Sequence, residues 1–200
     1  MNLLIDLVPT SVNINNKKYE INSDFRISIL FELLMQDSSI EDRDKVIMVL
    51  NLYYREVPPK KYWKEATEQI LWFYRCGKDL ITSKRKSKGK SDIKIYSFEY
   101  DDDYIYAAFM DQYGIDLQDI KELHWWKFKA MFKSLKEDNQ IVKIMGYRSM
   151  DLSKVKDKEQ KAYYKKMQNL YKLPLSKNEQ EKLEEIEKAL LNGEDISKLV

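Results

Sequence analysis

Residues that could carry out chemistry are few in this chain of 200 residues, which has one histidine and one cysteine. His124 lies beside two adjacent tryptophans, Trp125 and Trp126, with no serine–carboxylate arrangement near it. A lone histidine of this kind is far more often packed and hydrogen-bonded than catalytic. Cys76 is single, which excludes an internal disulfide framework and every zinc site built from several cysteines. We therefore expect Cys76 to be a small, buried, apolar residue.

An acidic triplet, Asp101–Asp103, and one arginine, Arg148, are the next candidates for chemistry. Three carboxylates in a row could hold a metal ion, but no histidine or further acidic residue lies nearby at ligand spacing. Acidic side chains also stabilise the positive end of a helix dipole, so we expect the triplet to open a helix. Arg148 can form a local ion pair with Asp151, or it can bind a phosphate or a substrate.

Motifs for phosphate binding and nucleophilic catalysis are missing from the chain. All five glycines are isolated, so there is no phosphate-cradling loop, and no nucleophile elbow is present. Two of the 33 acidic residues could act as an acid–base pair in catalysis, but the spacing of these residues does not point to any particular pair. We therefore expect a protein that is not an enzyme, with no catalytic, metal-binding or cofactor-binding residues and no cofactor.

The element that positions His124 is the stretch LHWWKFKAMF, residues 123–132. Neighbours on a helix lie about 100° apart, so the two tryptophans cannot share a face. One apolar stripe consists of Trp125, Phe128, Phe132 and Leu135, and a second, roughly opposite, consists of Leu123, Trp126 and Ala130. Such a helix either lies in the centre of a bundle or offers one face to another chain. The stretch is a core element first, with Trp126 and Leu123 as candidate partner-binding residues.

One short run, KRKSKGK, contains the whole positive excess of a chain whose net charge is +2. Residues 1–83 carry 11 basic and 12 acidic side chains, and residues 92–200 carry 19 and 21. The basic residues of the run are Lys84, Arg85, Lys86, Lys88 and Lys90. With serines and a glycine between its charges, the run is typical of a flexible linker. A nucleic-acid-binding patch is the alternative, which would make binding strongly salt-dependent.

Few glycines and prolines, with 44% hydrophobic and 34% charged residues, favour a mainly α (α+β) soluble domain. We expect Asn2–Leu7 to be a short strand. Residues 11–14 and 18–21 alternate polar and apolar, and Asn15-Asn16 between them suits a hairpin turn because asparagine tolerates positive φ.

Helix start and stop signals follow the hairpin along most of the chain. Three helices should begin after Ser23 or Asp24, after Ser38 or Ser39, and at Pro58-Pro59, with Gly77 as the last C-cap. Further helices should run from Asp101–Asp103 to Gly114, from Asp138 to about Met145 with an exit at Gly146, and from Asp157 to a stop before Pro174.

These elements divide the chain into four segments, a small β-hairpin followed by a multi-helix bundle in two parts. They are the hairpin with three helices (1–82), the flexible basic linker (83–95), a helical core (96–175) and a C-terminal amphipathic helix (176–200). The last helix opens with the capping-box spacing of Ser176 and Glu179. Leu183, Ile186 and Leu190, on its narrow apolar stripe, are candidate partner-binding residues. Such a helix docks on its own domain or binds a partner.

Targeting signals are not evident in the sequence. MNLLIDLVPT has no basic segment before its apolar residues, which makes it a poor secretory signal. No apolar run approaches the length of a membrane span. We expect a cytosolic protein that does not contact membranes.

Three ordered stretches carry a resemblance to a known family: FEYDDDYIYAAFMDQYGIDL, LHWWKFKAMFKSL and IVKIMGYRSMDLSKVKDKEQKAYYKKMQNLYKLP. Over roughly residues 98–174 they look like the bacteriophage gene-product-fifteen family, small proteins of the tail modules of long-tailed phages and prophages of Gram-positive bacteria. The resemblance implies a place between the major tail protein and the tape-measure protein, the slot of tail assembly chaperones. The resemblance implies no catalytic role for any residue of this chain.

The residues and the resemblance together favour a non-enzymatic tail-assembly protein in the host bacterial cytoplasm. Its expected role is that of a chaperone for the tape-measure protein, and other tail proteins or a second copy of the chain are further candidate partners. The alternatives are a nucleic-acid-binding accessory protein that acts through the basic linker, and a structural subunit of the phage tail.

Overall fold

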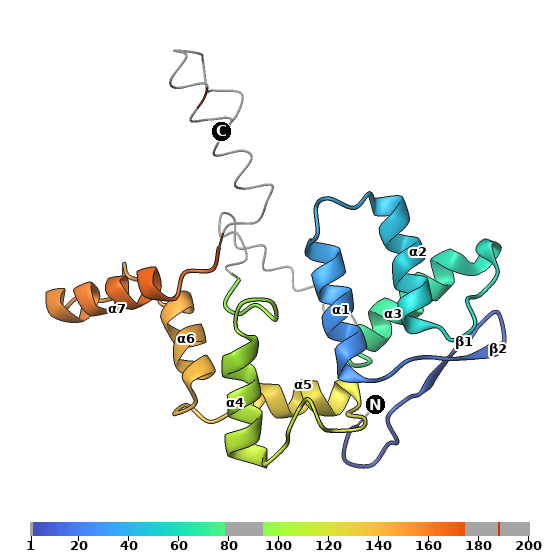
Figure 1. Ribbon diagram of the computed structural model, residues 1–200, viewed down its shortest axis with the longest axis horizontal. Coiled ribbons are helices and arrows are strands. Elements are labelled where there is room, and N and C mark those ends of the chain that lie inside the picture. The colour runs from blue at the N-terminus through green and yellow to red at the C-terminus, as the bar shows by residue number, and fades with distance from the viewer. Residues whose placement is uncertain (1, 79–93, 175–187, 189–200) are drawn as a thin grey trace.

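The computed structural model describes residues 2–78, 94–174 and 188, and these form a mainly α fold with one small β-hairpin (Figure 1). The hairpin strands are β1 (Ser11–Ile14) and β2 (Lys17–Glu20). The helices are α1 (Phe25–Gln36), α2 (Asp42–Tyr53), the short 3-10 helix η1 (Lys60–Tyr62), α3 (Trp63–Tyr74), α4 (Asp102–Tyr113), α5 (Trp125–Lys133), α6 (Gln140–Ser149) and α7 (Lys158–Leu170). The predicted fold class is confirmed.

The hairpin turns where the sequence predicts it. Val12 pairs with Tyr19 and Ile14 with Lys17 in an antiparallel register. Asn15 and Asn16 have φ angles of 46° and 60°, the left-handed conformation that a tight two-residue hairpin turn requires.

The strand predicted at Asn2–Leu7 is wrong, because this segment forms a local turn. The backbone N–H groups of Ile5 and Asp6 donate to the carbonyl oxygen of Asn2. The Asp6 carboxylate accepts from the N–H of Asn2 at 2.6 Å in return. Asparagine and aspartate favour such closed turns since their side chains reach nearby backbone groups.

The predicted helix starts are confirmed in α1 and α7 by side-chain caps. Asp24 accepts from the N–H of Arg26, and Asp157 accepts from the N–H of Gln160 at 2.7 Å. The exit predicted at Gly146 is wrong, because α6 continues through this glycine to Ser149. Asn139, rather than Asp138, is its N-cap.

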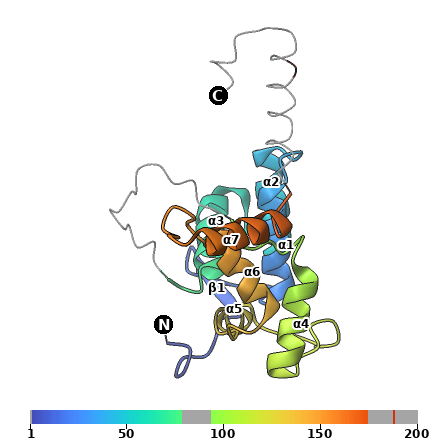
Figure 2. The ribbon, with the colours of Figure 1, turned by 90° about the vertical axis from the view of Figure 1, so that its left-hand side faces the viewer.

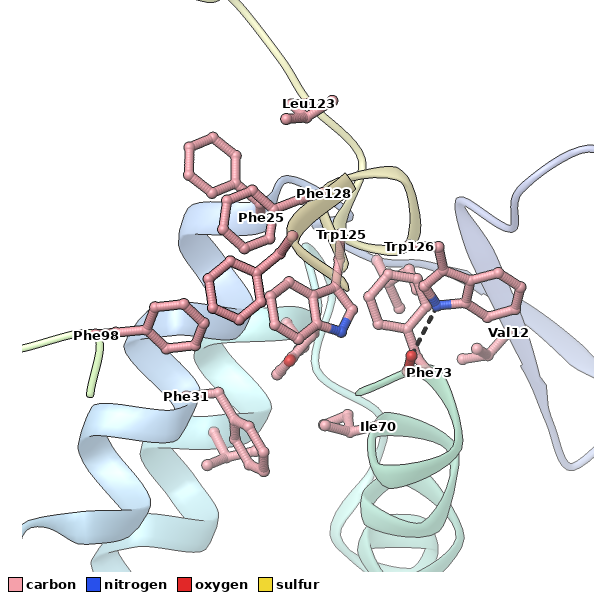
Figure 3. Packing of buried hydrophobic residues seen from close by; sticks show 14 of the residues in the cluster. Val12, Phe25, Phe31, Ile70, Phe73, Phe98, Leu123, Trp125, Trp126 and Phe128 are labelled. Atoms are coloured by element: carbon pink, nitrogen blue, oxygen red, sulfur yellow. Dashed lines mark hydrogen bonds between the residues drawn. The ribbon is translucent and has the colours of Figure 1, made fainter. Parts of the chain in front are cut away.

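A continuous apolar core joins the two helical parts predicted on either side of the basic run. Phe25 of α1 and Trp125 of α5 pack on Phe128 of α5, with ring centroids 4.8 and 5.7 Å away (Figure 3). Phe109 of α4 stacks on Phe128 at 4.9 Å. The segment between the parts, residues 79–93, lies outside the described residues. Both parts nevertheless contribute to one core, with α5 in its centre.

Candidate interaction site

Both adjacent tryptophans of α5 point into the molecule because the helix begins against the C-terminal end of α3. The indole N–H of Trp126 donates to the carbonyl oxygen of Phe73 at 2.7 Å (Figure 3). The indole N–H of Trp125 donates to the carbonyl oxygen of Tyr74 at 2.9 Å. The last carbonyls of a helix have no partner within it, so two neighbouring indoles satisfy two neighbouring acceptors.

Trp126 and Leu123, the candidate partner-binding residues of this stretch, are therefore placed in the core. Trp126 is 4% exposed and its ring packs edge-on against Trp72 at 5.6 Å. Leu123 is also buried, and its carbonyl oxygen accepts from the N–H of Phe25. Of the two alternatives for this helix, the structure has the central helix, because Leu123 and Trp126 of its second stripe are buried against the start of α1 and against α3. Ala130, at the far end of that stripe, is exposed. Partner binding through Trp126 or Leu123 would require the core to open.

His124 is a packed residue, as predicted, and it caps α5. Its Nδ1 accepts from the N–H of Trp126 at 3.1 Å, which places the ring proton on Nε2. Nε2 then donates to the carbonyl oxygen of Pro9 at 3.0 Å. Burial lowers the pKa of His124, so the neutral ring is favoured in the folded chain.

The ion pair predicted between Arg148 and Asp151 is wrong, since the guanidinium of Arg148 binds Asp101. Its Nη1 and Nη2 donate to the two carboxylate oxygens at 2.6 and 2.9 Å, and both side chains are buried. Asp151 forms an ion pair with Lys154 at 3.7 Å. Asp101 is thus committed to a buried pair, while Asp102 and Asp103 lie in the first turn of α4, where acids were expected.

Metal and thiol chemistry find little support in the described part of the chain. No group of three or more histidine, cysteine or acidic residues that could hold a metal ion occurs among the described residues. Cys76 is half-buried, and burial raises the pKa of its thiol, which keeps it protonated. No described helix is long and apolar enough to cross a membrane.

Several predicted site residues cannot be placed. Leu183, Ile186 and Leu190 of the C-terminal stripe lie outside the described residues, as do Lys84, Arg85, Lys86, Lys88 and Lys90 of the basic run.

The most exposed apolar side chains of the described chain lie in the N-terminal turn, a feature that the strand prediction missed. Leu4, Ile5 and Leu7 are 92%, 80% and 93% exposed, and Leu3 beside them is 45% exposed. We call these four residues the apolar turn. Contiguous exposed apolar surface marks interaction sites in soluble proteins. The sequence signal for this surface was the run of residues 3–7, in which four of five residues are large and aliphatic without the alternation of a strand.

Hydrogen bonds fix the position of the apolar turn relative to the rest of the fold. Its own hydrogen bonds close it between Asn2 and Asp6. Directly after it, the carbonyl oxygen of Pro9 binds His124 and that of Thr10 accepts from the N–H of Ile21 in the hairpin. The fold therefore presents these aliphatic side chains at a fixed place beside the start of α5.

The described residues thus define a mainly α protein with a closed aromatic core and an exposed apolar turn. A family model described as Bacteriophage Gp15 protein matches residues 4–173, and the chain belongs to this family. The resemblance noted over residues 98–174 is confirmed, and the match extends through the hairpin to the apolar turn. Neither the curated proteins nor the solved structures give a match. Membership indicates a bacteriophage structural or assembly protein that interacts with other phage proteins.

Proposed function

We propose that this protein is a non-enzymatic tail-assembly chaperone that binds the tape-measure protein before the tail tube forms. The observation that carries the proposal is the apolar turn, in which Leu4, Ile5 and Leu7 are each at least 80% exposed. Membership of a phage assembly family supports it, since such a surface needs a partner.

The physical basis is the burial of aliphatic side chains that the chain's own core leaves uncovered. Fully burying a leucine or isoleucine contributes roughly 1.5–3 kcal/mol. A long helical tape-measure protein exposes apolar stripes until it is enclosed, and such stripes form grooves when helices pair. The apolar turn, fixed by its hydrogen bonds, would fill such a groove with a small loss of conformational entropy.

The test is co-expression with the neighbouring tape-measure protein, followed by size-exclusion chromatography with light scattering. We expect one soluble complex, and insoluble tape-measure protein when it is expressed alone. The variant Leu4→Ser/Leu7→Ser should fold normally and lose the complex, because both side chains lie in solvent in the free chain.

The matched control replaces two exposed methionines elsewhere, Met35→Ser on α1 and Met48→Ser on α2. It should keep the complex, which separates the apolar turn from a general loss of surface hydrophobicity. Separate elution of the two wild-type proteins would contradict the proposal. A complex that survives Leu4→Ser/Leu7→Ser would remove the apolar turn from it.

A further inference from the structure

Helix α7 lies beside α6 at the edge of the molecule and buries none of its side chains (Figures 1 and 2). Its contact side is marked by Gln168, whose amide donates to the carbonyl oxygens of Tyr147 and Met150 at 2.9 and 2.8 Å. Tyr164 packs on Tyr147 from the same side. The opposite side of α7 is therefore open to solvent.

That open side is positively charged. At 100° per residue, the four lysines of α7 fall within an arc of about 140° that is centred opposite Tyr163 and Tyr164. Both tyrosines pack on Tyr147. Lys161, at the edge of the arc, lies about 20° from Gln168. The four lysines are Lys158, Lys161, Lys165 and Lys166, and all are exposed. We call them the lysine face. Ala162 lies within this arc, and Tyr163 and Leu170, two exposed apolar side chains, lie beside it.

The four lysines of the lysine face form no ion pair among the described residues. Residues 154–172 contain seven lysines and two acidic residues, a balance of +5, against +2 for the whole chain. Lys154 pairs with Asp151, but none of the other six lysines forms an ion pair with a described carboxylate. Like charges spaced three or four residues apart destabilise a helix. An acidic partner would relieve this repulsion.

The complementary charge follows directly in the sequence. Residues 176–200 contain seven acidic residues and four lysines, and five of the acids are glutamates between positions 179 and 187. Glu179 and Glu187 are eight positions apart, as Lys158 and Lys166 are, and eight steps along a helix rise about 12 Å. The sequence predicts this segment to be a helix that opens at Ser176. The two charged stretches therefore match in sign and in length.

We propose that residues 176–191 bind back along the lysine face of their own chain, antiparallel to α7. Four residues separate Tyr171 from Ser176, a connection of the length that joins antiparallel helices in an αα-hairpin. Tyr171 is a fixed starting point, because its carbonyl oxygen accepts from Nε of Arg148 at 2.6 Å. Glu179 and Glu187, which lie on the same side of the segment as its apolar stripe, then face lysines. Leu183 and Ile186 contact Ala162 and Tyr163.

A tethered acidic segment suits this face better than nucleic acid does. A short linker gives the segment an effective concentration in the millimolar range, so weak ion pairs and modest apolar contacts are sufficient to hold it. Nucleic-acid sites spread positive charge over a wider surface and use arginine heavily. Arg148, whose guanidinium donates to the carbonyl oxygen of Tyr171 just after α7, is buried against Asp101.

The experiment uses the full chain at a concentration where light scattering shows a monomer. A carbodiimide joins amines and carboxylates that are in contact, and mass spectrometry identifies the products. We expect links from Lys158, Lys161, Lys165 or Lys166 to glutamates of 179–187 in the monomer. Hydrogen exchange should show backbone protection over 180–191.

Charge reversal tests the contact itself. Lys161→Glu/Lys165→Glu should remove the links and lower the protection about tenfold. The control Lys60→Glu/Lys64→Glu changes two exposed lysines at the same spacing on η1 and α3 and should leave both readouts unchanged. Adding Glu179→Lys/Glu187→Lys to the α7 variant should restore the protection, because these two glutamates lie on the same side of the segment as its apolar stripe.

Three outcomes would overturn the proposal. The first is a full chain without links or protection. The second is links that occur only between two copies. The third is a lysine face that shifts short duplex DNA in a gel at 0.1 M salt and loses this shift in Lys161→Glu/Lys165→Glu, which would assign the face to nucleic acid.

Discussion

Asp101 and Arg148, 47 residues apart in the sequence, form a buried two-pronged ion pair that joins three segments of the chain. Their side chains are 1% and 9% exposed. Asp101 also accepts from the N–H of Ser97 at 2.8 Å. Arg148 also donates to the carbonyl oxygens of Ile95, at 3.1 Å, and of Tyr171, at 2.6 Å. The pair thus connects the entry to α4, the last turn of α6 and the residue that follows α7.

Removing one partner of this pair should destabilise the protein strongly. Arg148→Ala or Asp101→Ala leaves a buried charge uncompensated, and each should lower the free energy of unfolding by about 3–5 kcal/mol. Urea denaturation monitored by circular dichroism measures this change. The double variant Asp101→Leu/Arg148→Met should recover much of the loss, because it removes both charges.

The exposed pair Lys154–Asp151 is the control for the buried one. Lys154→Ala breaks a 3.7 Å contact whose lysine side chain is 80% exposed, and it should change stability by less than about 1 kcal/mol. If Arg148→Ala costs no more than Lys154→Ala, the buried pair does not hold the three segments together.

Gly77 and Gly114 offer a matched comparison for the packing of Trp126. Their φ angles are 67° and 62°, so alanine at either position incurs similar backbone strain, about 1–2 kcal/mol. A Cβ at Gly77 would lie 2.8 Å from Cη2 of Trp126, whereas a Cβ at Gly114 meets nothing within 4 Å. Gly77→Ala should therefore lower the melting temperature more than Gly114→Ala. If both variants lower the melting temperature equally, Trp126 is not packed closely against Gly77.

Local signals predicted most of the secondary structure. Asp24 and Asp157 cap helices, and Asn15-Asn16 turns the hairpin, because each acts on backbone groups within three residues of itself. The strand predicted at Asn2–Leu7 was wrong for a related reason, since a strand also needs a distant partner. There the apolar run suggested a strand, but no second strand pairs with it among the described residues, and Asn2 closes a turn instead.

The contacts that define the candidate surfaces depend on the tertiary fold and could not be predicted. A helical wheel places Trp126 about 100° from Trp125 and on a different stripe, yet both are buried because α5 meets the end of α3, where two carbonyl oxygens accept from their indole N–H groups. The nearby Asp151 suggested a partner for Arg148, but the fold brings Asp101 closer. The lysine face was missed because charges counted over residues 92–200 nearly cancel, although they separate into a basic α7 and an acidic segment after it.

The second asparagine of the hairpin turn should show a clear side-chain preference. Asn16 has a φ of 60°, which glycine adopts freely and a β-branched residue adopts only with strain. Asn16→Gly should leave the midpoint of urea denaturation unchanged or raise it slightly, since Asn-Gly suits this turn. Asn16→Val should cost about 1–2 kcal/mol. A valine variant as stable as the glycine variant would rule out the left-handed turn.

His124 should make the stability of the protein depend on pH just below neutrality. Burial lowers its pKa in the folded chain below the ordinary value of 6.5, which the unfolded chain retains. Between these two pKa values the unfolded state binds more protons than the folded state. The free energy of unfolding should therefore fall as the pH is lowered through 6.5, and it should not change through this group above about pH 7.5.

The variant His124→Asn isolates this contribution, because asparagine can also cap α5 by accepting from the N–H of Trp126. This variant loses the hydrogen bond to Pro9 at every pH, so its free energy of unfolding should be lower than that of the wild type and should depend less on pH. Urea denaturation of both proteins between about pH 7.5 and 5.5 stays above the range in which most carboxylates titrate. Parallel curves for the two proteins would show that His124 carries no proton-linked stability. A wild-type stability that rises as the pH falls would mean that the folded chain favours the charged ring, contrary to its burial against Phe73 and Trp126.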